Sequence, residues 1–222
     1  MGNSSQPYVD LSIGNSEWRI SFLYEVMHYH RGMTIKYRLQ REGLLGGWLR
    51  DLAVAGAFLT RLPFRPTPPV DMADLGPATR VFPLVGLVVG TFGGGALWLA
   101  WQLSLQPMAC AIIGLALTAW ISGGLHEDGL ADFADGIGAG DQARRLAIMR
   151  DSRIGTFGVL VLIFSIGLKV MLLAGFAAPG LAAATLIGAA AASRGMMPVL
   201  MFALRPARVD GLGRDAGRPT EI

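Results

Sequence analysis

The hydrophobic and polar residues of this chain are sorted into long blocks. Four apolar runs follow one another after residue 80, and each contains at most one charged side chain. The runs are Val81–Leu105, Met108–Leu125, Ile154–Gly180 and Leu181–Leu204. A helix needs about 20 residues to cross a hydrocarbon core about 30 Å thick, and only helices or closed barrels satisfy their backbone there. Because the runs show no strand alternation, they predict four transmembrane helices in an all-α, multi-pass bundle.

A shorter apolar stretch, Gly46–Leu62, precedes these runs and carries Arg50, Asp51 and Arg61. Three alternatives fit it: an interfacial helix, a re-entrant helix or a weak fifth span. A proline-rich segment follows, and proline both lacks the backbone N–H and restricts the residue before it. Phe64–Val70 is therefore predicted to be an extended loop.

The distribution of basic residues predicts an orientation. Nine Lys and Arg residues precede residue 81, four lie in residues 126–153 and four in residues 205–222. The short connections near Gln106 and Gly180 carry none. We therefore expect the three charged regions to share one side, which the positive-inside rule makes the cytoplasm.

The amino-acid composition narrows the classes of protein to which this chain can belong. Hydrophobic residues make up 52% of the 222 residues and charged residues 16%, against about 25% in an average soluble domain. This excludes a disordered chain or a conventional nucleic-acid binder and indicates membrane lipid as the surroundings. The single cysteine, Cys110, cannot form an internal disulfide and is expected to be a small packing residue. Residues 1–43 are more polar and are expected to be a disordered extension, unassigned in function, before a membrane-embedded domain at 44–222.

Six acidic residues fall between positions 127 and 151, where the second apolar run ends. If the helix continues out of the membrane, Asp128, Asp132 and Asp135 lie at i, i+4 and i+7 on one face. Like charges at this spacing repel, and hard oxygen ligands favour Mg²⁺, Mn²⁺ or Ca²⁺. The cluster therefore predicts a cation and chemistry on a phosphate or diphosphate. The alternative is a solvated acidic loop, which suits Asp141 as the N-cap of a following helix.

Basic residues follow the acidic cluster. Arginine binds phosphate oxygens through two parallel hydrogen bonds. Arg150 and Arg153 are candidate phosphate ligands because Asp151 and Ser152 are interleaved with them. Arg144 and Arg145 fit this role or that of positive-inside flanking charges equally well.

Arg194 lies beside Ser193 within an apolar run. An arginine at bilayer depth costs at least roughly 2.5 kcal/mol unless it meets water or an anion, so we treat it as a candidate site residue. The alternative is a side chain that reaches the interface from a span with different bounds. His126 is either a general base or a structural interfacial histidine.

The chain resembles the cobalamin synthase family, also called adenosylcobinamide-GDP ribazoletransferases, over about residues 44–213. The motifs that carry the resemblance are Phe58–Pro63, Phe82–Gly86, the acidic block Gly123–Gly136, Asp151–Gly158, Ala192–Arg194 and Gly211–Gly213. Members usually continue past the position of Ile222, so we expect this chain to be truncated at its C-terminus.

The resemblance implies a multi-pass enzyme of the bacterial cytoplasmic (inner) membrane, with its Asp-rich loop and active site facing the cytoplasm. It would depend on Mg²⁺ and join adenosylcobinamide-GDP to α-ribazole, or to α-ribazole 5′-phosphate, releasing GMP. We expect catalytic residues at His126, Asp128 and Asp132. The expected metal ligands are Glu127, Asp128, Asp132 and Asp135. The expected phosphate or substrate contacts are Arg61, Arg150, Asp151, Ser152, Arg153, Ser193 and Arg194.

Two other classes compete. A CDP-alcohol phosphotransferase-like enzyme would also use aspartates and Mg²⁺, but its usual arginine shortly after Asp128-Gly129 is missing here. A transporter would use intramembrane charges to line a pathway, yet the acidic cluster lies at a membrane face and no inverted repeat is evident.

Overall fold

The computed structural model describes residues 44–67, 69–208, 211–217 and 219, so the expected disordered extension lies outside them. Every regular element among the described residues is helical, which confirms the all-α class. In chain order they are α2 (Leu44–Leu59), η1 (Met72–Asp74), α3 (Leu75–Ala78), η2 (Thr79–Val81), α4 (Phe82–Gln102), α5 (Pro107–Ile121), α6 (Leu125–Ile137), α7 (Gln142–Ile148), α8 (Thr156–Ala174), α9 (Pro179–Ala203) and α10 (Leu212–Asp215).

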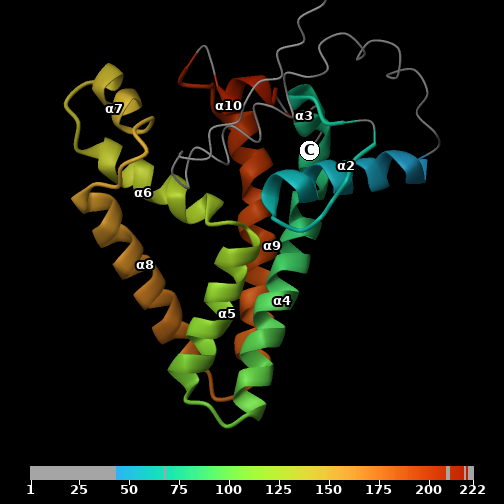
Figure 1. Cartoon of the computed structure of the whole chain (residues 1–222), viewed down its shortest axis with the longest axis vertical. Coiled ribbons are helices and arrows are strands. Elements are labelled where there is room, and N and C mark those ends of the chain that lie inside the picture. Colours follow the sequence, from blue (N-terminus) through green and yellow to red (C-terminus); the bar gives the residue numbers. More distant parts are fainter. Residues whose placement is uncertain (1–43, 68, 209–210, 218, 220–222) are drawn as a thin grey trace, which may run out of the picture.

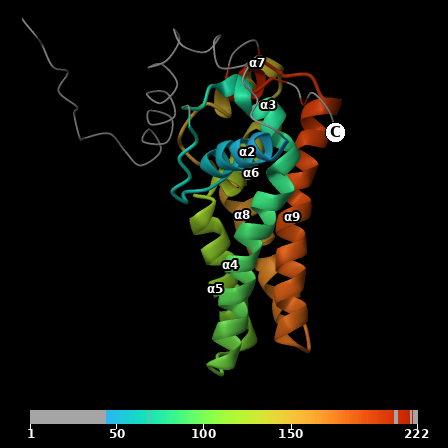
Figure 2. The same ribbon diagram turned by 90° about the vertical axis from the view of Figure 1, so that its right-hand side faces the viewer.

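The centre of the fold is the antiparallel pair α4 and α9, which lie side by side in both views (Figure 1; Figure 2). Gly86, Gly90 and Gly94 recur every four residues along the contact face of α4. A Cβ at Gly90 would lie 2.7 Å from the Ile187 Cα, and one at Gly94 would lie 2.9 Å from the Ala183 carbonyl oxygen. Small residues at this spacing let two helix backbones approach closely, which drives helix association in lipid.

Three helical stretches are long and apolar enough to cross a membrane: Leu75–Gln102, Thr156–Ala174 and Pro179–Ala203. They confirm three of the four predicted spans. The fourth, α5, has 15 residues and reaches only about 22 Å at 1.5 Å per residue. It passes the same test only together with α6, from which it is bent by 90°.

The ends of the bundle differ in polarity. The connections 103–106 and 175–178 lie at one end, at the bottom of Figure 1, and carry no charge. α2, α6, α7 and α10 gather at the other end (Figures 1 and 2). The described parts of the three charged regions therefore share one end of the molecule, as the charge pattern predicted.

α2 lies across the bundle rather than along it (Figure 1). Its Asp51, 9% exposed, pairs with Arg80 at 2.6 Å, and Arg50 pairs with Asp74 at 2.9 Å. The Arg80 guanidinium also stacks 4.5 Å from the Trp48 ring centroid. α2 is thus attached to the segment before α4 as an interfacial helix would be, and it is not among the described helices that are long and apolar enough to cross a membrane.

Two of the sequence motifs meet in the core beside α2. The rings of Phe58 and Phe82 stack with centroids 6.4 Å apart. The ring of Phe64 packs on Gly56, where a Cβ would lie 2.5 Å from it, and fixes the predicted extended loop to α2. The aromatic residues of these motifs therefore pack the core beside α2. Cys110 is buried in a second apolar cluster, which confirms its packing role.

Candidate active site

The acidic helix α6 is set at its angle by a break after α5. Gly123 and Gly124 adopt positive φ values of 62° and 69°, a conformation that glycine reaches without strain. The Ile121 carbonyl, left free at the end of α5, accepts a hydrogen bond from the Arg61 N–H at 2.7 Å. The helix of the second apolar run therefore does not continue unbroken, because the backbone turns by 90° here and α6 begins anew.

The predicted spacing of the aspartates survives this break, because all three lie on α6. Asp128 is exposed, whereas Asp132 and Asp135 are half-buried. Burial raises the pKa of Asp132, and the negative charges of Asp128 and Asp135 raise it further. Arg208, which follows α9, acts in the opposite direction. The three carboxylates therefore influence one another across one helix face, with a single arginine opposing their effect on Asp132.

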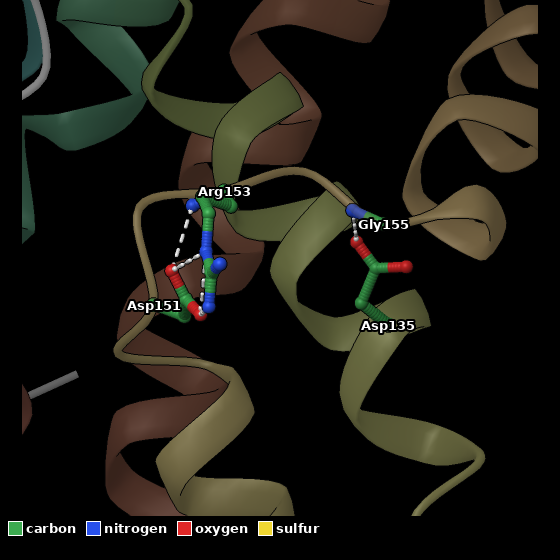
Figure 3. Close-up of polar contacts among 4 residues, drawn as sticks. All are labelled: Asp135, Asp151, Arg153 and Gly155. Carbon is green, nitrogen blue, oxygen red and sulfur yellow. Dashed lines mark hydrogen bonds and ion pairs between the residues drawn. The ribbon is translucent and has the colours of Figure 1, made fainter.

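The Asp135 carboxylate contacts the start of α8 (Figure 3). Its Oδ2 accepts a hydrogen bond from the Gly155 N–H at 2.7 Å, and its Oδ1 accepts one from the Gly158 N–H at 2.8 Å. Gly155 is the N-cap residue of α8. The side chain thus satisfies two of the N–H groups that a helix leaves without internal partners at its first turn.

The donor set can be tested against a divalent cation. Among the described residues, no three His, Cys, Asp or Glu side chains lie close enough to hold a metal by themselves. Mg²⁺, however, is usually bound through one or two carboxylates, with waters and substrate phosphates filling its other positions. Asp128 and Asp132 suit that arrangement, because they are neighbouring carboxylates whose charges repel. A ligand role for Asp135 stays a prediction, since each of its oxygens keeps a second lone pair.

The next group comprises Arg194 and Ser193 on α9 and two residues at the start of α6. Arg194 is 8% exposed and lies within electrostatic range of Glu127. Its Nη1 donates to the Ser193 hydroxyl at 3.0 Å, while its Nε is buried without a hydrogen-bond partner among the described residues. The Oε2 of Glu127 is likewise buried without a hydrogen-bond partner among the described residues. The Nε2 of the adjacent His126 is also buried. Opposite charges with unused hydrogen-bonding capacity are thus enclosed at this end of the bundle.

The Arg150–Arg153 turn lies between α7 and α8 at the same end. Asp151 accepts hydrogen bonds from Arg153, the shortest at 2.7 Å, and these bonds lower the pKa of Asp151 (Figure 3). Arg150, Ser152 and Arg153 are exposed. The structure therefore pairs Asp151 within its own turn rather than adding it to the acidic face of α6.

Several contacts bear on residues that the sequence left open or missed. Asp141 caps α7 by accepting a hydrogen bond from the Arg144 N–H at 2.8 Å, as predicted. The Arg144 side chain lines a hollow of about 260 Å³ with Asp135 and Phe157. Arg208 was not a candidate; it donates to the Leu146 carbonyl at 2.6 Å and affects Asp132. Its position in the charged tail after α9 was the sole available signal.

The fold and this site define a helical membrane protein with an acidic helix and buried charge at one end of its bundle. The model of the cobalamin-5-phosphate synthase family matches residues 51–221, and the chain belongs to that family. It is 45% identical over 172 residues to the adenosylcobinamide-GDP ribazoletransferase of Bradyrhizobium diazoefficiens, covering 77% of this chain and 66% of the relative. With the protein of the same name from Brucella anthropi, identity is 44% over 186 residues, covering 82% of this chain and 70% of the relative. No solved structure matches the chain.

Proposed function

We propose that this chain is an adenosylcobinamide-GDP ribazoletransferase of the bacterial cytoplasmic membrane. The relatives from Bradyrhizobium and Brucella carry that name. A ribose hydroxyl of α-ribazole, or of α-ribazole 5′-phosphate, attacks the phosphorus that carries cobinamide. The new P–O bond replaces the bond to GMP, which leaves, and the hydroxyl proton passes to a base of the protein.

The observation that carries this proposal is the enclosure of Arg194 and Glu127 at the acidic end of the bundle. The partnerless Nε–H of Arg194 suits an oxygen of an anionic group, since a buried donor without a partner is costly. Diphosphate cleavage develops negative charge on the transferred and leaving oxygens, and a positioned cation stabilises it. The exposed side chains of Arg150, Arg153 and Arg61 surround the same end and suit the substrate's remaining phosphate oxygens.

The acidic face of α6 supplies the second requirement. Asp128 and Asp132 are the carboxylates that would hold Mg²⁺, with Glu127 as a further candidate ligand. When bound, the cation supplies charge neutralisation for the diphosphate. His126 or one of these carboxylates accepts the hydroxyl proton, because they are the candidate bases on the acidic helix.

The orientation follows from charge. The end of the bundle that carries α2, α6, α7 and α10 would face the cytoplasm, since basic residues concentrate there and the opposite connections carry no charge. Cytoplasmic substrates would then reach the acidic helix without crossing the bilayer.

The test is turnover by the purified protein in detergent or liposomes, with adenosylcobinamide-GDP, α-ribazole and Mg²⁺. Chromatography should show a cobalamin product and GMP in equal amounts, and EDTA should abolish both. Asp132→Asn should lose activity, whereas Asp141→Asn should retain it, because asparagine also caps a helix. If the Brucella anthropi relative makes product in the same assay and this chain makes none, the proposal is contradicted.

A further inference from the structure

The acidic motif places Asp135 among the expected metal ligands, yet its carboxylate is committed to the backbone of α8. The two hydrogen bonds, at 2.7 and 2.8 Å, use both oxygens and come from residues 20 and 23 positions further along the chain. A carboxylate on backbone N–H groups forms short, charge-assisted bonds, and the positive end of the helix dipole adds to them. This contact joins α6 to α8 directly.

Gly155 and Gly158 leave room for the Asp135 carboxylate because they have no side chains. A Cβ on Gly155 would lie 2.5 Å from Asp135 Oδ1, and a Cβ on Gly158 would overlap Asp135 Oδ2. Any larger residue at either position would push the carboxylate away. The motif's glycines therefore fit a side chain of the protein itself rather than a substrate or another helix.

The same contact fills the anion site that α8 would otherwise offer. A helix N-terminus binds phosphate through its free N–H groups. Here Asp135 occupies the N–H groups of Gly155 and Gly158. These two N–H groups are therefore not free for a substrate phosphate, and Arg153, two residues before Gly155, is a candidate donor in their place.

We propose that Asp135 is a positioning residue that holds the start of α8 and, with it, the Arg150–Arg153 turn against the acidic helix. This inference rests on the proposed function for the role of the turn, but the attachment itself does not. In Figure 3 the chain runs from Asp151 through Arg153 to Gly155, which meets Asp135. Loss of the attachment would free the turn that carries Arg150 and Arg153.

Two variants break the contact in different ways. Asp135→Asn keeps the shape but replaces one accepting oxygen with an NH₂ group, which cannot accept from an N–H. Gly158→Ala keeps every carboxylate and displaces the one at position 135. Gly167→Ala is the matched control, because it lies on the same helix and a Cβ there meets nothing within 4 Å.

The first readout is limited trypsin cleavage after Arg150 and Arg153 in detergent, without substrate. Both contact variants should be cleaved about tenfold faster or more, and Gly167→Ala at the wild-type rate, since each lost charge-assisted bond shifts an equilibrium about 10- to 100-fold. Wild-type cleavage in both contact variants would overturn the attachment, whether or not the chain makes cobalamin.

The second readout separates positioning from metal binding. Both variants should raise the KM for adenosylcobinamide-GDP or lower kcat/KM by about 10- to 100-fold, with the Mg²⁺ concentration for half-maximal activity within about twofold of wild type. The double variant should be no worse than either single one, because both remove the same contact. A large rise in the Mg²⁺ requirement for Asp135→Asn, with Gly158→Ala like Gly167→Ala, would make Asp135 a metal ligand and overturn the proposal.

Discussion

Arg194 on α9 and Glu127 on α6 carry opposite charges that act on each other, although the two residues are 67 positions apart in the sequence. Each keeps one buried polar atom without a hydrogen-bond partner among the described residues. Buried charges are usually fully hydrogen-bonded, and an exception indicates a site that is completed by something else. An anionic substrate oxygen would accept from the Arg194 Nε–H, whereas the Glu127 oxygen would need a cation or a hydrogen-bond donor.

Arg194→Gln should lower kcat/KM about 10- to 100-fold, because a hydrogen bond to a charged group contributes about 1.5–3 kcal/mol. Arg194→Lys should lose most of this activity too, since lysine lacks the guanidinium fork. Combining Arg194→Gln with Glu127→Gln should restore thermal stability but not turnover. Steady-state kinetics and thermal unfolding in detergent check this; wild-type turnover by Arg194→Gln would contradict the site.

Asp132→Asn should stabilise the protein while abolishing turnover. Burial, then Asp128 and Asp135, raises the pKa of Asp132 above its ordinary value of 3.8. The folded state therefore binds this proton more tightly than the unfolded state, so the ionised carboxylate lowers stability at neutral pH. This penalty disappears as pH falls through the raised pKa.

The measurement is the melting temperature of wild type and Asp132→Asn between pH 7 and pH 4. The variant should melt higher at pH 7, and the difference should shrink at the acid end. Mg²⁺ should raise the melting temperature of wild type more than that of the variant, because a ligand stabilises the state that binds it. A lower melting temperature for the variant at pH 7 would rule out this account.

Gly90 and Gly95 of α4 should respond differently to substitution by alanine, because only Gly90 faces α9. Gly90→Ala should destabilise the bundle by about 1–3 kcal/mol, because its Cβ would lie 2.7 Å from the Ile187 Cα and force the helices apart. Gly95→Ala meets nothing within 4 Å and should stabilise α4 by up to about 1 kcal/mol. Unfolding curves in mild detergent compare them; equal midpoints would mean that the close approach is not required.

The ion pair between Arg80 and the largely buried Asp51 is one of the contacts that attach α2. Arg80→Gln leaves the Asp51 carboxylate, with 13% of its side chain exposed, without its ion-pair partner. We expect a loss of about 1–3 kcal/mol, partly recovered when Asp51→Asn is added. Hydrogen exchange of α2 amides should quicken in the single variant and return toward wild type in the double one. No change in either would indicate that apolar packing alone holds α2.

Features that depend on neighbouring residues could be predicted from the sequence. The apolar runs predicted α4, α8 and α9, and Asp141 was predicted as a cap because its partner, the Arg144 N–H, is three positions away. Contacts between residues far apart in the chain could not be predicted from the sequence. The Ile121 carbonyl at the end of α5 accepts a hydrogen bond from the Arg61 N–H, 60 positions away, and hydrophobic periodicity does not predict this contact.

The prediction of the candidate site was limited in the same way, because several of its contacts join residues far apart in the sequence. Spacing placed three aspartates on one helical face, but it could not distinguish a carboxylate facing solvent from one bound to backbone N–H groups 20 and 23 positions away. The glycines at positions 155 and 158 indicated a close approach without saying of what. The position of Arg208 in the charged tail did not indicate its partners, because its hydrogen bond to Leu146 and its effect on Asp132 arise only in the fold.

α5, α6 and α8 form a triangle in Figure 1, with α6 as its short side. One corner is the turn after Ile121, and the second is the apolar cluster that joins Ala111 of α5 to Val170 of α8. The third corner is the bond pair of Asp135. Three helices that contact one another at all three corners of a triangle cannot change their angles, whereas helices joined at only two corners can rotate relative to one another. Loss of the two Asp135 hydrogen bonds would therefore weaken one of the three contacts that fix the angles between these helices.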